Sequence, residues 1–532
     1  MKRSSGILMP ISSLPSPYGI GTLGKAAREF VDFLAEARQS YWQILPVGPT
    51  SYADSPYQSP STFAGNPYFI DLDLLKEDGL LKQEEIDAYA WGDDPAKADY
   101  GLLYENRLRL LARAAARGWE RDRAEVDAFA RENGKWLPDY ALFMALKRQF
   151  GMKPWLEWPE DIRLRKPEAV ARWREELAED VRLFTYLQFL FFRQWADLRA
   201  YAHEKEIKIL GDLPIYVALD SADVWSSPEN FQLDEENVPV KVAGVPPDYF
   251  SADGQLWGNP LYDYDYMRRN GYGWWIDRIG GAEKLYDVIR IDHFRGFASY
   301  WAVPYGEKTA KKGEWISGPG MELVGMLQNW FHDLAFVAED LGYPTPDVAK
   351  LLKDSGLPGM KVLEFAFDED EESNHMPHLY TPNSICYAGT HDNSTLAGWR
   401  KNVRHEVTDL AAEYFGLNEK EGFVWGMIRG GMSSVSNLFV AQMQDYLELD
   451  DDARMNMPGN ALGNWRWRMK PGEIPEGLAE KIARMTELYG RCEPKPAEPE
   501  EEPAEAAEDA AEEAGAGAVD EKETGKPVRT GE

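Results

Sequence analysis

The chain has 532 residues, 44% of them hydrophobic, which suffices for one large barrel domain with insertions or for three ordinary domains. Its net charge of −32 at pH 7 argues against nucleic acid and against an anionic membrane surface, because both would repel it. A neutral polar ligand is compatible with this charge. The 19 Trp and 26 Tyr offer aromatic faces for sugar rings, although an aromatic-rich core explains most of them individually.

The cysteines and the N-terminus bear on the compartment. The two cysteines, Cys386 and Cys492, form no CxxC motif and no disulfide framework, which fits a reducing cytoplasm. The basic N-terminus could open a signal peptide, but the apolar run 7–11 is interrupted by Pro10 and is too short. No stretch reaches the roughly 18 apolar residues of a membrane span. We therefore expect a cytoplasmic protein.

Short apolar runs that end in polar or acidic residues alternate with helical patterns along the chain. Apolar residues at helical spacing predict helices over 26–37 and 176–200. Strands alternating with helices predict a parallel sheet, and their number favours a (β/α)8 barrel over an open sheet. The predicted strands are 7–12, 41–47, 207–217, 287–291, 334–338, 361–367 and 384–388.

The second and third predicted strands are separated by about 160 residues, too many for a plain loop in a compact domain. Helical patterns at 100–117 and 140–150 predict that this segment is a mostly helical insertion packed beside the barrel. The domain prediction is a barrel over 1–492, with a helical subdomain at about 74–200 and an active-site loop region at 220–286.

The C-terminal segment 493–532 differs from the rest in composition. It holds fourteen acidic and four basic residues, many Ala and Pro, and almost no large apolar side chains. Such a segment cannot bury enough surface to offset its ordering entropy, so we predict a disordered acidic tail.

Four predicted strands end in carboxylates. Asp212 follows the third strand, Asp292 the fourth, Glu339 the fifth and Asp392 the seventh. The active site of such a barrel lies at the C-terminal ends of its strands. One acidic residue after a strand is common, but four in this order are hard to explain as solvated loop ends.

Glycoside cleavage accounts for such a set. Its oxocarbenium-like transition state needs an anion near the anomeric carbon and a proton donor at the leaving oxygen, and two carboxyls about 5–5.5 Å apart supply both with retention of configuration. We predict Asp292 as nucleophile and Glu339 as general acid/base with a raised pKa. Arg290, two residues earlier on the same strand face, should hold Asp292 ionised.

A metal site is the competing interpretation for the segment around His203, Glu204 and Glu206. Charged residues at a helix end explain it better, and no convergent set of ligands occurs elsewhere in the sequence. We therefore predict neither a metal nor a cofactor.

The motifs carry a resemblance to a known family. RIDHFRG, AEDLG and GTHDN resemble conserved regions of the α-amylase superfamily, and specifically of glycoside hydrolase family 77, the amylomaltases or 4-α-glucanotransferases. SSLPSPYGIGTLG, DSPYQSPSTFAGNPY, GDLPIYV, PPDYFSADGQLWGNP, GEWISGPG and GNWRWR resemble the same family, so the similarity spans about residues 6–469.

The resemblance implies roles for single residues. Asp292 resembles the family nucleophile, Glu339 the acid/base and Asp392 the third carboxylate, which stabilises the transition state. It implies maltooligosaccharides and starch- or glycogen-derived α-1,4-glucans as substrates. The implied substrate-binding residues are Arg290, His391, Tyr57, Asp212, Asp248, Trp257 and Asn464.

Two positions depart from the family pattern. Glu364 stands where a Gln is expected, and Ser394 follows HDN where another acidic residue is usual. Neither is one of the three carboxylates, so the departures concern the groove and not the chemistry.

Three functions remain open. A glycosyl-enzyme can be resolved by a sugar or by water, and spacing alone does not separate a transferase from a hydrolase. The loop 245–260, with Tyr249, Phe250 and Trp257, has the aromatic bulk to exclude water. The resemblance favours transfer between α-1,4-glucans. A non-catalytic glycan-binding protein is the third reading, disfavoured because all three carboxylates are retained.

Overall fold

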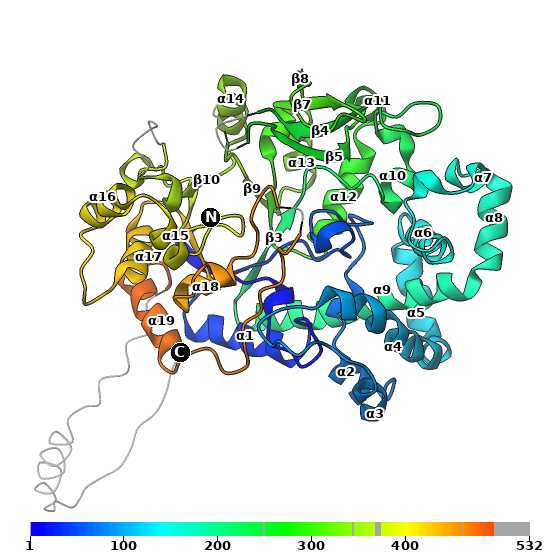
Figure 1. The fold of residues 1–532 in the computed structure, drawn as a ribbon, viewed down its shortest axis with the longest axis horizontal. Coiled ribbons are helices and arrows are strands. Elements are labelled where there is room, and N and C mark those ends of the chain that lie inside the picture. The colour runs from blue at the N-terminus through cyan, green and yellow to red at the C-terminus, as the bar shows by residue number, and fades with distance from the viewer. Residues whose placement is uncertain (1, 248–250, 343–344, 368–373, 461, 494–532) are drawn as a thin grey trace, which may run out of the picture. The chain divides into compact units, whose positions relative to one another are not determined.

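The protein is built around a parallel barrel of eight strands (Figure 1). The computed structural model describes residues 2–247, 251–342, 345–367, 374–460 and 462–493. The barrel strands are β1 (Ser4–Leu8), β2 (Tyr41–Gln43), β3 (Lys208–Leu213), β6 (Val288–Ile291), β9 (Ala335–Ala338), β10 (Gly359–Val362), β11 (Ser384–Tyr387) and β12 (Leu438–Gln442). The predicted (β/α)8 fold is therefore confirmed.

The strands follow one another around the barrel in chain order. Hydrogen bonding runs from β10 through β11, β12, β1, β2, β3 and β6 to β9. Between β9 and β10, Ala338 N–H donates to Pro358 O at 3.0 Å, and Met360 N–H donates to the Asp340 carboxylate at 2.7 Å. These bonds join the two ends of the sheet.

The barrel interior is filled by alternate strand residues. One buried cluster consists of inward-facing side chains, among them Leu210, Val288, Val337 and Tyr387. Because strand side chains alternate between faces, Asp212 and Arg290 share the inward face with Leu210 and Val288. The register places Asp212 directly opposite Arg290. A larger cluster packs the outer strand faces against the helices.

Helices occupy the long segment between β2 and β3, as predicted. In Figure 1, α4 to α9 lie to one side of the barrel. The helices here are α2 (Leu72–Glu77), α3 (Gln83–Asp87), α4 (Tyr100–Arg121), α5 (Arg123–Glu132), α6 (Leu137–Gln149), α7 (Glu160–Arg163), α8 (Pro167–Glu176) and α9 (Ala178–Glu204). Whether they form a separate subdomain stays a prediction.

The remaining helices cover the rest of the barrel. They are α1 (Lys25–Glu36), α10 (Ala222–Ser226), α11 (Tyr264–Arg269), α12 (Gly273–Glu283), α13 (Met321–Trp330), α14 (Pro346–Ser355), α15 (Leu396–Asn402), α16 (His405–Phe415), α17 (Phe423–Ser433), α18 (Met443–Tyr446) and α19 (Leu478–Leu488). Within the described ranges, none of the helices combines the length and the apolar character needed to cross a membrane.

A second sheet was not predicted. Four antiparallel strands, in the order β5-β4-β7-β8, lie above the barrel in Figure 1. Their bounds are β4 (Lys241–Val245), β5 (Gln255–Pro260), β7 (Ser299–Pro304) and β8 (Glu314–Ser317). Part of the segment 220–286, expected to be loops, thus pairs with residues beyond β6. Such pairing depends on tertiary contacts, which the short sequences of β4 and β5 do not reveal.

Several predicted strand bounds were wrong. The first strand ends at Leu8 rather than at residue 12, because Pro10 precedes a 3₁₀ turn at Ile11–Ser13. The predicted strand 361–367 ends at Val362, and another 3₁₀ turn follows at Leu363–Phe365. The eighth strand, β12, was not predicted.

Close packing beside Asp212 yields a stability prediction. A Cβ added to Gly211 would lie 2.2 Å from the Tyr286 ring. We expect Gly211→Ala to lower the free energy of unfolding by about 1–3 kcal/mol, since overpacking forces the ring or the strand to move. Urea denaturation measures this change. Gly273→Ala is the matched control, because a Cβ there meets no atom within 4 Å. Equal unfolding free energies for the two variants would contradict the prediction.

Candidate active site

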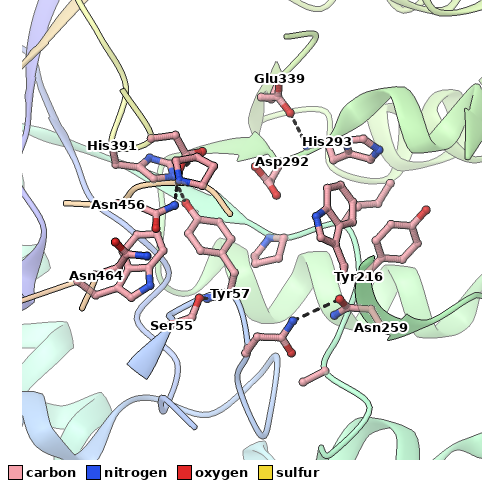
Figure 2. Close-up of a pocket in the computed structure, with 18 of the residues that line it drawn as sticks. Ser55, Tyr57, Tyr216, Asn259, Asp292, His293, Glu339, His391, Asn456 and Asn464 are labelled. Atoms are coloured by element: carbon pink, nitrogen blue, oxygen red, sulfur yellow. Dashed lines mark hydrogen bonds and ion pairs between the residues drawn. The ribbon is translucent and has the colours of Figure 1, made fainter. Parts of the chain in front are cut away.

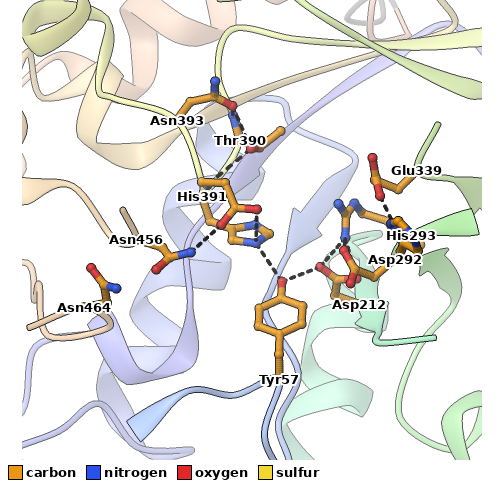
Figure 3. A network of polar contacts seen from close by, with 12 residues as sticks. Tyr57, Asp212, Asp292, His293, Glu339, Thr390, His391, Asn393, Asn456 and Asn464 are labelled. Atoms are coloured by element: carbon orange, nitrogen blue, oxygen red, sulfur yellow. Dashed lines mark hydrogen bonds and ion pairs between the residues drawn. The ribbon is translucent and has the colours of Figure 1, made fainter. Parts of the chain in front are cut away.

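The carboxylates predicted at the strand ends meet around one cavity (Figures 2 and 3). Asp292, Glu339 and Asp392 line it, together with Tyr57 and His391. Asp212 lies behind them, with a fully buried side chain. The close-ups show Tyr57, His391, Asn456 and Asn464 on one side of Asp292, and Glu339 and His293 on the other.

Arg290 is the cation at the centre of this cluster. Its Nη1 donates to both carboxylate oxygens of Asp212 at 2.7 Å and to Oδ1 of Asp292 at 3.0 Å. The Arg290 side chain is 3% exposed, whereas that of Asp292 is 27% exposed and faces the cavity. Burial lowers the pKa of the guanidinium, but the neighbouring Asp212 and Asp292 outweigh this, so its pKa lies well above the ordinary value.

Glu339 is held by two backbone donors. Its Oε2 accepts a hydrogen bond from His293 N–H and its Oε1 accepts one from Leu341 N–H, both at 2.7 Å. Burial raises the pKa of Glu339 to about 7, although Arg290 and these two N–H groups oppose the shift. The pKa of Glu339 is therefore raised, as expected.

Burial also raises the pKa of Asp292, and the charges of Asp212, Glu339 and Asp392 act in the same direction. Arg290 opposes this shift, as expected, but does not cancel it. The direct contact with Arg290 favours the negatively charged form of Asp292.

A third group surrounds Asp392. Tyr57 donates its hydroxyl proton to Asp212 Oδ2 at 2.8 Å. The hydroxyl oxygen of Tyr57 also lies 2.8 Å from His391 Nε2. Burial lowers the pKa of His391, so a neutral ring with its proton on Nε2 fits this contact. Asp392 Oδ1 accepts a hydrogen bond from Asn456 Nδ2 at 2.6 Å. The arrangement points polar groups into the cavity from one side.

The remaining predicted residues differ in their placement. Trp257 lines the cavity with its indole edge-on to His293, the ring centroids 4.7 Å apart. Asn464 also lines it, and its Oδ1 accepts a hydrogen bond from Met457 N–H at 3.0 Å. Asp248, Tyr249 and Phe250 lie outside the described residues. Tyr57, one of the implied substrate-binding residues, stacks its ring on that of His391, and the two ring centroids lie 5.4 Å apart.

Comparison with known proteins gives the family. A family model described as 4-alpha-glucanotransferase, glycoside hydrolase family 77, matches residues 9–474. The chain belongs to this family. It is 50% identical over 487 residues to a 4-alpha-glucanotransferase of Clostridium butyricum, covering 91% of this chain and 100% of that relative. A Thermus thermophilus member is 46% identical over 503 residues, covering 92% of this chain and 99% of the relative.

Solved structures agree. The amylomaltase of Streptococcus agalactiae, solved in complex with acarbose, superimposes with a TM-score of 0.90 at 42% identity, covering 92% of this chain and 100% of that one. The amylomaltase of Corynebacterium glutamicum has a TM-score of 0.73 at 21% identity, covering 92% of this chain and 74% of that one, and shows the shared fold.

The two departures from the family pattern lie near Asp392. Ser394 Oγ accepts a hydrogen bond from Arg454 at 3.1 Å, and the same guanidinium donates to the Asp392 carbonyl at 2.7 Å. Glu364 is buried, and burial followed by the charge of Asp445 raises its pKa well above the ordinary value. A neutral Glu364 has an O–H donor and a carbonyl acceptor, so like a Gln side chain it can both donate and accept hydrogen bonds.

Sequence reasoning missed Asn456 and Arg454, which contact Asp392 from a segment after the last barrel strand. Neither residue lies in the motifs that carry the family resemblance, and each contacts Asp392 across more than sixty positions of the chain. No spacing in the sequence could have identified them.

The ion pairs of Arg290 with Asp212 and Asp292 lead us to predict that losing the charge of Asp212 destabilises the protein strongly. We expect Asp212→Asn to lower the free energy of unfolding by about 2–4 kcal/mol, because the buried Arg290 loses the charge of its closest partner. Urea denaturation at pH 7 measures this change. Asp333→Asn is the control, since the Asp333 side chain is 88% exposed and its pair with His332 lies at the surface. A loss at Asp212 no larger than at Asp333 would contradict the prediction.

Proposed function

We propose that the protein is a 4-α-glucanotransferase that moves segments of α-1,4-glucan from a donor to the 4-hydroxyl of an acceptor glucan or glucose. The observation that carries this proposal is the placement of Asp292 beside Arg290, with the buried Glu339 on the other wall of the same cavity. Family membership favours transfer over hydrolysis. Maltooligosaccharides and starch- or glycogen-derived glucans are the proposed substrates, and the cytoplasm is the proposed location.

The proposed reaction is a double displacement. Asp292 attacks the anomeric carbon while Glu339 gives its proton to the leaving glycosidic oxygen, so the bond to the leaving glucan breaks as the bond to Asp292 forms. The acceptor 4-hydroxyl then attacks the anomeric carbon and gives its proton back to Glu339, which releases Asp292. Each carboxyl ends as it began, and the configuration is retained.

The surrounding residues have proposed roles on either side of the bond. Asp392 holds sugar hydroxyls of the donor ring and stabilises its distorted transition state, together with His391 and Tyr57 on the same side of Asp292. Arg290 favours the anionic form of Asp292 as it leaves the glycosyl-enzyme, and Asp212 fixes Arg290. Trp257, Asn464 and Asp248 are proposed as groove residues.

Incubation of the purified protein with maltotriose tests the proposal. Glucose together with maltooligosaccharides longer than maltotriose indicates transfer. Glucose and maltose alone would instead indicate a hydrolase of the same superfamily, and an unchanged substrate a glycan-binding protein. Product ladders from chromatography distinguish the three outcomes.

Loss of the nucleophile should abolish turnover. We expect Asp292→Asn to lower kcat by at least about 10⁴-fold, since an amide cannot form the glycosyl-enzyme, while the fold is retained. Initial rates with maltotriose measure the loss and circular dichroism checks the fold. Asp265→Asn, at an exposed side chain on α11, is the matched control. Activity above about 1% in Asp292→Asn would remove it from the nucleophile role.

The pKa of Glu339 predicts the alkaline side of the pH profile. The acid form is needed for bond cleavage and its pKa is about 7, so kcat/KM should fall as the pH rises through about 7. In Glu339→Gln, this fall of kcat/KM with rising pH should be absent. The variant should also retain more activity on α-glucosyl fluoride, whose leaving group needs no proton, than on maltotriose. Equal loss on both substrates would argue against the acid role.

A further inference from the structure

Trp315 is an exposed aromatic residue on the rim of the catalytic cavity. It lies on β8, an edge strand of the antiparallel sheet, and is 46% exposed although it lines the same cavity as Asp292 and Glu339. Single exposed aromatic residues are ordinary on protein surfaces. What sets Trp315 apart is that it combines a place in the cavity with a ring held by its neighbours.

The Trp315 ring is fixed from the protein side. Its strand register places it directly opposite Trp301, and the two rings meet edge-on with centroids 5.3 Å apart. Trp301 is itself anchored, because its Nε1 donates to Ala310 O at 2.8 Å. Its indole also packs so closely over Gly313 that a Cβ there would lie 2.4 Å from the ring. Trp315 thus needs little ordering when a ligand arrives.

A cation links Trp315 to the catalytic loop. The Arg295 guanidinium carbon lies 4.5 Å from the centroid of the Trp315 ring. Arg295 follows Asp292 by three positions and His293 by two, in the 3₁₀ turn Phe294–Phe297 that begins after His293. It is 9% exposed, so it supports the indole from the buried side and leaves the exposed surface of the ring available.

The position of Trp315 along the groove follows from the residues on the two sides of Asp292. His391, Tyr57 and Asn456 lie on one side of Asp292, and Glu339 with His293 on the other (Figure 2). Asp392 is hydrogen bonded to Asn456 and so belongs to the first side. An acid that protonates the leaving oxygen must lie on the leaving-group side, where the acceptor later binds. Arg295 and Trp315 continue the wall that begins with His293 and Trp257. Trp315 is therefore on the acceptor side.

We propose that Trp315 is a stacking platform for a glucose unit of the acceptor beyond the unit next to the reacting bond, and that it makes longer acceptors bind better than glucose. The inference rests on the proposed transferase function and adds a specificity-determining residue to it. The apolar C–H face of a glucose ring covers the exposed indole face, while the sugar hydroxyls stay in water. A single glucose bound beside the reacting bond does not extend to Trp315.

The test uses α-maltosyl fluoride as donor and follows fluoride release, because in turnovers of this donor only the acceptor occupies this side. Transfer to glucose and to maltotriose is measured separately by product chromatography. We expect Trp315→Ala to raise KM for maltotriose about tenfold, equivalent to ~1.4 kcal/mol, while KM for glucose changes by no more than about twofold. Trp315→Phe, which keeps a flat face, should lie between the wild type and Trp315→Ala.

Trp330→Ala is the matched control, since Trp330 is 61% exposed at the end of α13 and is not among the cavity-lining residues. It should leave both KM values unchanged. A Trp315→Ala enzyme with an unchanged KM for maltotriose, or with the same increase for both acceptors, would overturn the proposal. If Trp315→Ala does not fold, the KM ratio of Trp315→Phe decides by the same criterion. If the wild-type enzyme transfers the maltosyl group only to water, so that it merely hydrolyses the donor, the transferase function itself is refuted.

Discussion

The site depends on one guanidinium inside a barrel. Arg290 lies between the carboxylates of Asp212 and Asp292. Asp212 and Arg290 stand opposite each other on neighbouring strands, and Asp292 directly follows the strand of Arg290. A buried carboxylate without a partner would be protonated or would destabilise the fold. With these ion pairs in place, Asp292 can carry a negative charge at the bottom of the cavity. The chemistry proposed for Asp292 depends on this arrangement, and so does much of the local stability.

Burial acts in the same direction on the two central carboxyls, but their direct partners differ. Asp292 has a cation at 3.0 Å, whereas Glu339 has two backbone N–H groups and no direct contact with the guanidinium among the hydrogen bonds of the described residues. Burial raises the pKa of both, and the direct ion pair with Arg290 favours the charged form of Asp292. Two similar side chains in one cavity can thus take the parts of nucleophile and acid.

The sequence predicted the parts of the molecule that are governed by local pattern. Inward alternation along strands and a carboxylate at the strand end are local properties, so the barrel and the positions of Asp212, Asp292, Glu339 and Asp392 could be derived. Other parts depend on contacts between distant segments. The β12 strand was not predicted, the antiparallel sheet pairs strands from two sides of β6, and Asn456 reaches Asp392 only through the fold. Trp315 needed its neighbours in space before its exposure could be interpreted.

The join between β9 and β10 bears on how Glu339 works. Glu339 directly follows β9, which is hydrogen bonded in register to β6 on one side but meets β10 through Pro358 and the Asp340 side chain rather than through a regular ladder. Asp292, the proposed nucleophile, by contrast follows a strand that is paired on both sides. A group that first gives a proton and then takes one from a different molecule has to adjust to two partners in turn. Glu339 lies beside the join between the two ends of the sheet, whereas Asp292 follows a strand with regular ladders on both sides.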